Sequence, residues 1–193
     1  TPTELAPHGL AGCCTSNGAH GIYSAWEGIT RFESGVAMVN LFLNRASPWM
    51  DIHSYLPYEG KVVLLNKKAH AALIRVPGWI NAEKIKCFVK SKGHDQQEVV
   101  ATRCGTRLLL EVLKTGDEIT LQFPLIEQTD QYTLFGKKYT ISFKGSTVVD
   151  ISPRDEKGAP YPIFMRDRYK GNKAPMKKVK CFVADKIIPL GTF

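Results

Sequence analysis

The feature that most constrains the fold is an alternation of apolar and polar residues that begins near residue 31 and recurs along the chain. Half-buried strands alternate with a period of two, whereas a helix repeats its apolar positions about every 3.6 residues. The clearest case is "DEITLQFP" (117–124). The side chains expected to face inward are Ile119, Leu121 and Phe123, and those expected to face outward are Glu118, Thr120 and Gln122.

Further strands are predicted over 36–44, 61–68, 69–79, 138–145 and 179–187. "VAMVNLFLN" (36–44) is apolar on both faces, and the segment 69–79 is expected to stop at Pro77-Gly78. "STVVDIS" (146–152) is expected to continue the preceding strand after a kink at Gly145. Short strands spaced by about 8–12 residues and separated by glycine and proline are typical of sandwiches and barrels. We therefore predict a mainly β fold, an antiparallel β-sandwich or two packed sandwich subdomains, preceded by one short N-terminal helix.

The helix is predicted from about Asn17 to Gly28, because Ile22, Trp26 and Ile29 recur at helical spacing. The candidate N-cap residues are Thr15, Ser16 and Asn17. A lone helix with this apolar stripe needs a surface on which to bury it. It either packs on the sandwich or belongs to a helical domain outside this chain.

Two adjacent cysteines, Cys13 and Cys14, precede this predicted helix. They are poor disulfide candidates, since the chain has five cysteines and no secreted cysteine pattern. As metal ligands they supply half of a tetrahedral zinc shell, and His8 and His20 flank them at a spacing that no standard zinc motif uses. As a nucleophile, a cysteine near a helix N-terminus gains from the positive end of the helix dipole. The residues alone leave these readings open.

The remaining cysteines are expected to be buried, reduced thiols: Cys87, Cys104 and Cys181. Residues 152–178 are rich in proline and charge, which predicts a long irregular loop. The basic stretch 166–180 contributes to a net charge of +8. It has no arginine cluster and no aromatic platform, so we interpret it as a solvated loop and expect no nucleic-acid partner. No apolar run is long enough to cross a membrane, so we expect no membrane partner. The sequence does not indicate a compartment.

Three motifs come in a recognisable order: Cys13-Cys14 with Asn17, then Asn40-Leu41, then the run Arg75 to Trp79. This ordered set resembles the downstream part of glycoside hydrolase family 127, the β-L-arabinofuranosidase-like enzymes. The resemblance implies an (α/α)6 catalytic barrel followed by β-sandwich domains. It also implies a retaining mechanism in which Cys13 is the nucleophile, with Cys13 and Cys14 binding zinc, and L-arabinofuranose-containing or other plant-type glycans as substrates.

The family pattern includes a Glu-x-Cys motif and an acid/base glutamate upstream of the cysteine pair, and this chain has neither. We therefore expect residues 1–30 to be a remnant of the helical barrel and residues 31–193 to be the β-sandwich region. The partner that the resemblance implies is an upstream helical barrel. The isolated chain is predicted to be inactive, with zinc absent or substoichiometric. Asn17 is expected to cap the helix.

The alternative function is a non-catalytic β-sandwich module that binds carbohydrate or supports another domain. Its candidate sugar-stacking residues are Trp49, Tyr55, Tyr58 and Trp79. Aromatic residues at strand ends more often pack against the core or against a neighbouring domain. Their exposure distinguishes the two interpretations.

Overall fold

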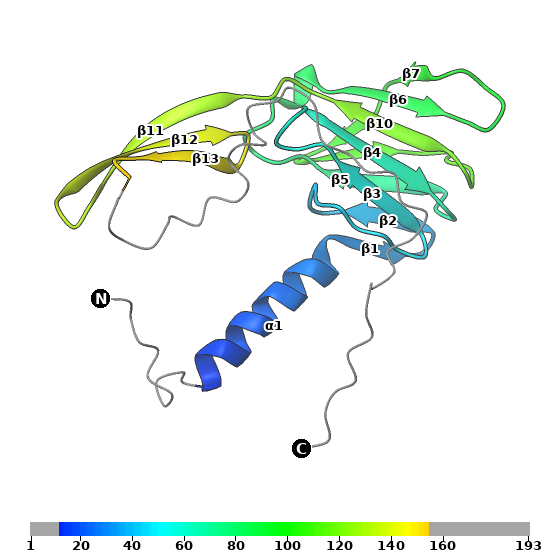
Figure 1. Ribbon diagram of the computed structural model, residues 1–193. Coiled ribbons are helices and arrows are strands. Elements are labelled where there is room, and N and C mark those ends of the chain that lie inside the picture. Colours follow the sequence, from blue (N-terminus) through cyan, green and yellow to red (C-terminus); the bar gives the residue numbers. More distant parts are fainter. Residues whose placement is uncertain (1–11, 155–193) are drawn as a thin grey trace.

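The structure, a computed structural model, describes residues 12–154 and the side chains of residues 16–154. It contains one α-helix, a β-sandwich and a smaller third sheet (Figure 1). The predicted strand 179–187, the basic stretch 166–180 and nearly all of the predicted loop 152–178 lie outside the described residues. So do His8 and Cys181.

Helix α1 spans Gly12–Gly28 and therefore includes the cysteine pair. The prediction that it begins at Asn17 and that Asn17 caps it was wrong, whereas its end at Gly28 is confirmed. No proline interrupts residues 12–17, and small polar residues are tolerated in the first turns of a helix. The helix consequently extends beyond the residues that carry its apolar stripe. Cys13 lies in its first turn rather than in a preceding loop.

Two five-stranded sheets form the sandwich. The strands of the first sheet, in spatial order, are β1 (Thr30–Glu33), β2 (Val36–Val39), β5 (Ala71–Arg75), β9 (Arg107–Leu110) and β8 (Thr102–Cys104). Those of the second are β3 (Met50–Ser54), β4 (Lys61–Asn66), β10 (Glu118–Gln122), β6 (Lys86–Lys90) and β7 (Gln97–Val99). All neighbours are antiparallel except β2 and β5. The predicted mainly β, sandwich-like fold is confirmed.

The core lies between these two sheets and takes fully buried side chains from both, such as Val39 and Ile74 on one side and Leu64 and Ile119 on the other. On β10 the predicted alternation is confirmed for its apolar residues and for its two end residues. Thr120, predicted to face water, is instead buried. Its cross-strand neighbours are Val63 and Phe88, which flank it on both sides of this central strand.

The segment 36–44 is not a single strand, because β2 ends at Val39. The backbone N–H groups of Asn40 and Leu41 both donate to the Ile29 carbonyl, at 2.8 and 3.3 Å. The first of these bonds continues the register of the β1–β2 pair, and both tie the segment after β2 to the residue that joins α1 to β1. The predicted stop before Pro77-Gly78 is confirmed, since β5 ends at Arg75.

The third sheet, β11 (Glu127–Leu134), β12 (Lys137–Lys144) and β13 (Thr147–Ser152), extends to one side of the sandwich (Figure 1). Residues 146–152 do not continue β12, as was predicted, but return beside it as an antiparallel partner. Gly145 adopts φ +60 in the turn between them, a conformation that suits a tight hairpin. A Cβ there would lie 3.0 Å from the Trp79 ring, so Trp79 packs closely under this turn.

The prediction of buried thiols is confirmed for Cys87 and wrong for Cys104. Cys87 lies on β6 facing the core, and this burial, aided by the charge of Glu98, raises the pKa of its thiol to about 11. Cys104 ends β8, a three-residue edge strand whose side chains are all exposed. An edge strand this short covers little of the core.

Candidate active site

The predicted site residues Cys13 and Cys14 lie in the first turn of α1, beyond the part of the chain whose side chains the structure describes. Of their candidate neighbours, His20 is exposed on the same helix. Among the described side chains, no group of three or more His, Cys, Asp or Glu residues could hold a metal ion.

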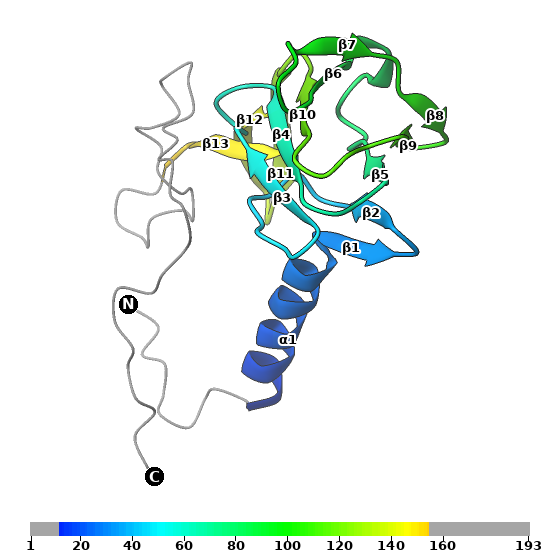
Figure 2. The same ribbon diagram turned by 90° about the vertical axis from the view of Figure 1, so that its right-hand side faces the viewer.

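Helix α1 projects from the sandwich, and its N-terminal end lies farthest from the strands (Figures 1 and 2). Residues 16–27 are all exposed, including Ile22 at 75%, Tyr23 at 57% and Trp26 at 48%. Only where the helix runs into β1 does the chain become buried, with Ile29 at 3%. The apolar stripe is thus divided: Ile29 packs in the sandwich core, whereas Ile22 does not pack on the described part of the sandwich.

Asn40 connects the end of α1 to the sandwich. Its side-chain Nδ2 donates to the Gly28 carbonyl at 2.9 Å, and its Oδ1 accepts from Arg107 Nη1 at 3.1 Å. The last carbonyls of a helix lack partners within the helix, so the Asn40 amide satisfies one of them from outside. The positive charge of Arg107 near this end also complements the helix dipole. The second sequence motif identified Asn40 but did not indicate this role, and nothing in the sequence indicated Arg107.

Arg45 makes a second connection to α1. Its guanidinium carbon lies 3.1 Å from the centroid of the Trp26 ring, which is a close cation–π stack. The backbone of Arg45 exchanges hydrogen bonds with Ile52, which places the side chain on the edge of the second sheet. Its Nε and Nη1 atoms are buried and have no hydrogen-bond partner among the described residues. The indole face is therefore the main partner of this cation.

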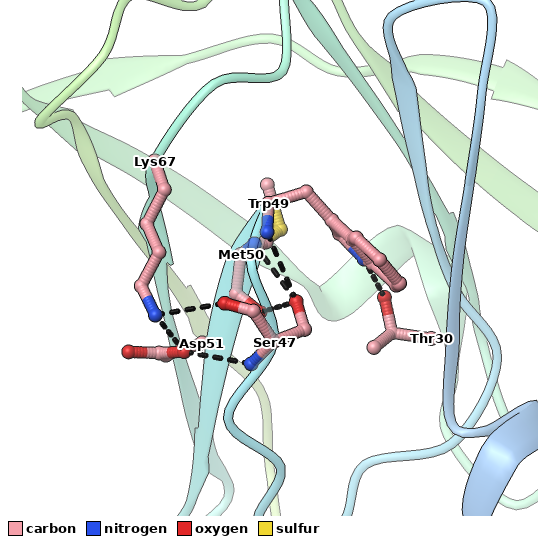
Figure 3. Close-up of polar contacts among 6 residues, drawn as sticks. All are labelled: Thr30, Ser47, Trp49, Met50, Asp51 and Lys67. Carbon is pink, nitrogen blue, oxygen red and sulfur yellow. Dashed lines mark hydrogen bonds and ion pairs between the residues drawn. The ribbon is translucent and has the colours of Figure 1, made fainter. Parts of the chain in front are cut away.

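The tryptophans proposed as sugar-stacking residues pack onto the protein instead. Trp49 donates from Nε1 to Thr30 Oγ1 at 3.1 Å (Figure 3). Its ring also stacks on Phe32, with the ring centroids 5.8 Å apart. Ser47 and Asp51 hold its loop in place, with Lys67 Nζ donating to Asp51 Oδ1 at 2.7 Å.

Trp79 packs edge-on against Phe123, with ring centroids 5.9 Å apart. Lys61 Nζ lies 4.3 Å above the ring of Tyr55. These contacts support the packing interpretation.

Two adjoining clefts open where β6 and β7 meet β8 and β9, with volumes of about 320 and 300 Å³. They share Ala82, Arg103 and Leu108, and the second is also lined by Val76, Pro77 and Gly78 of the third motif. Neither cleft is lined by an aromatic side chain. A sugar ring would find no stacking surface there. Within the described residues, no helix is long and apolar enough to span a membrane.

The sequence matches no known protein-family model and no curated protein. Three solved structures share its fold, and each aligns with 72% of the chain. A GH127 β-L-arabinofuranosidase from Geobacillus stearothermophilus T6 is 20% identical, with a TM-score of 0.50 and 24% of its own chain covered. A glycoside hydrolase is 17% identical (TM-score 0.53, 25% covered), and a GH127 β-arabinofuranosidase is 19% identical (TM-score 0.53, 26% covered).

The chain thus spans about a quarter of the length of these proteins. Sequence identities this low establish a common fold and leave the activity to be argued from the residues. The resemblance that the ordered motifs indicated is confirmed at the level of the fold: the described residues share their fold with a part of GH127 β-L-arabinofuranosidases.

Proposed function

We propose that this chain is the C-terminal portion of a retaining glycoside hydrolase in which Cys13 is the nucleophile and Cys14 is a zinc ligand. The observation that carries the proposal is the placement of the cysteine pair. In a fold shared with three glycoside hydrolases, α1 extends its exposed face away from the sandwich and has Cys13 and Cys14 in its first turn. A helix whose residues 16–27 are exposed and that points away from the sandwich is suited to pack within a second, helical domain.

The chemistry required of Cys13 is covalent catalysis. Its thiolate attacks the anomeric carbon of the sugar, and the bond to the departing glycosidic oxygen breaks as a general acid protonates that oxygen. Water then attacks the same carbon and releases the sugar from sulfur, so two inversions retain the configuration. A position in the first turn of α1 favours the thiolate, because the helix dipole is positive there.

Two cysteine thiolates fit zinc as soft ligands, and they fill half of a tetrahedral shell. Bound zinc would keep the nucleophile deprotonated at neutral pH. Since the described side chains offer no further cluster of ligands, the proposal assigns the rest of the shell, the acid/base and the sugar pocket to a helical barrel upstream. The proposed substrates are L-arabinofuranose-containing or other plant-type glycans, and residues 1–193 alone are expected to be inactive and to bind less than one zinc per chain.

The test compares Cys13→Ala with Cys104→Ala in a longer protein that also contains the residues encoded upstream of Thr1. Cys104 is the matched control, since it is an exposed cysteine on β8, in the sandwich. With an aryl β-L-arabinofuranoside as substrate, Cys13→Ala should abolish hydrolysis while Cys104→Ala keeps it. Full activity of Cys13→Ala would refute the nucleophile. One zinc per isolated chain would refute the shared shell and favour a local site with His8 and His20.

The alternative, a sandwich that binds carbohydrate through exposed aromatic rings, is weakened by the packing of Trp49 and Trp79. A module of this kind is expected to present a flat, accessible aromatic ring on which a sugar can stack. Both tryptophans are instead partly buried against the core, which reduces the ring surface open to a sugar.

A further inference from the structure

Helix α1 is held to the sandwich through its C-terminal end. Residues 16–27 are exposed, and the strand that α1 chiefly contacts is β1, which follows it directly in the chain. The direction of the whole helix is therefore set by the few bonds made around Gly28 and Ile29.

Asn40 supplies two of these bonds, one from its backbone and one from its side chain. Its backbone N–H donates to the Ile29 carbonyl at 2.8 Å, and its side-chain amide donates to the Gly28 carbonyl at 2.9 Å. Arg107, which lies 67 residues later on β9, donates to the other end of the same amide. An amide is suited to this position because it can donate to the helix and accept from the arginine at the same time.

The geometry amplifies small changes at this point. With a rise of about 1.5 Å per residue, Cys13 lies about 22 Å along the helix from Gly28. A tilt of about 10° at Gly28 would therefore move Cys13 by about 4 Å, whereas catalytic groups must be held to within about 0.5 Å.

We propose that Asn40, itself held by Arg107, is a positioning residue that fixes the direction of α1 and thereby the location of Cys13 and Cys14. The catalytic meaning of this inference rests on the proposed function, whereas the structural part does not. Trp26 stacked on Arg45 restrains the last turn from a second side, but it does not replace the donor to the Gly28 carbonyl.

The experiment measures the distance between α1 and the sandwich in the full chain. Spin labels introduced as unnatural amino acids at His20 and Lys90, both exposed, avoid the native cysteines. Pulsed electron paramagnetic resonance should give one narrow distance distribution for the wild type. Asn40→Ala should broaden it, and the isosteric Asn40→Asp should do the same, because a carboxylate keeps the acceptor for Arg107 but cannot donate to Gly28.

The matched control is Asn66→Ala. Asn66 is buried and also uses both ends of its amide, donating to the carbonyls of Ala69 and Lys114 and accepting from the Ala69 N–H, in the loops beyond β4. This variant should lose stability and yet keep the narrow distribution. An unchanged distribution in Asn40→Ala or Asn40→Asp, or equal broadening in Asn66→Ala, would overturn the inference.

An assay of the active protein adds a second readout. Because loss of the Asn40 side chain is expected to displace Cys13 and Cys14 and to leave the proposed sugar pocket in place, Asn40→Ala should lower kcat by about 10- to 100-fold and leave KM nearly unchanged. Equal kcat values for Asn40→Ala and the wild type would refute a positioning role. Absence of hydrolysis by the wild type would refute the proposed function instead, and the distance distributions would still decide whether Asn40 directs the helix.

Discussion

Replacing Arg45 with methionine should stabilise the protein, although Arg45 makes a close contact with Trp26. The stack, with the guanidinium carbon 3.1 Å from the ring centroid, is worth about 1–2 kcal/mol when it is shielded from water. Against this, Nε and Nη1 are buried with no hydrogen-bond partner among the described residues, and such groups cost about 1–3 kcal/mol each. Methionine removes both unpaired nitrogens and still packs on the indole through its thioether.

The two nitrogens together cost about 2–6 kcal/mol and the stack is worth about 1–2 kcal/mol, so the difference predicts a gain of about 2–3 kcal/mol in the free energy of unfolding for Arg45→Met. Urea denaturation followed by circular dichroism measures it. Arg45→Lys is the control, since it keeps a buried charge, loses the planar stack and should be less stable than wild type. In a Trp26→Ala background the gain should shrink, because water then reaches the guanidinium. A loss of more than about 1 kcal/mol in Arg45→Met, or a gain independent of Trp26, would refute this reasoning.

Two further predictions concern the sandwich. Gly60→Ala should prevent folding, because the new Cβ would clash with the Phe123 carbonyl oxygen. Gly78→Ala is the control and should fold normally, since the space around Gly78 is open. Equal yields of folded protein from the two variants would contradict this prediction. In the folded protein at pH 8, Cys104 should be alkylated rapidly and Cys87 hardly at all, as mass spectrometry of labelled peptides can show. Alkylation of Cys87 at the rate of Cys104 would rule out its burial. The stability contributed by the neutral Cys87 thiol should be intact below pH 9.0 and lost as the pH rises toward its pKa of about 11.

Local sequence patterns predicted the strands well where the apolar residues of a strand alternate and a proline follows its end. Ile119 and Leu121 on β10 were identified by alternation alone, and the stop before Pro77 by its ring. Thr120 was missed because the pattern describes one strand, whereas burial of this side chain depends on Val63 and Phe88 from the strands beside it.

The candidate site was predictable only as a list of residues. Cys13 and Asn40 stood out as parts of ordered motifs, but the bond that joins Asn40 to Arg107 spans 67 residues and leaves no local signature. The start of α1 was missed for a different reason. A helix that is not packed along its length has no apolar periodicity to mark its first turns, so its extent beyond Asn17 could not be read from spacing.

The parallel pairing of β2 with β5 has a consequence for the order of events during synthesis. The chain between these strands must cross to the opposite sheet and form β3 and β4 there before it returns as β5 beside β2. The arginine that completes the Asn40 bond arrives later still, on β9, so contacts this distant in sequence form late in folding. We therefore expect the helix with the cysteines to leave the ribosome before the sandwich and the Asn40–Arg107 bond to form only after β9 has been made.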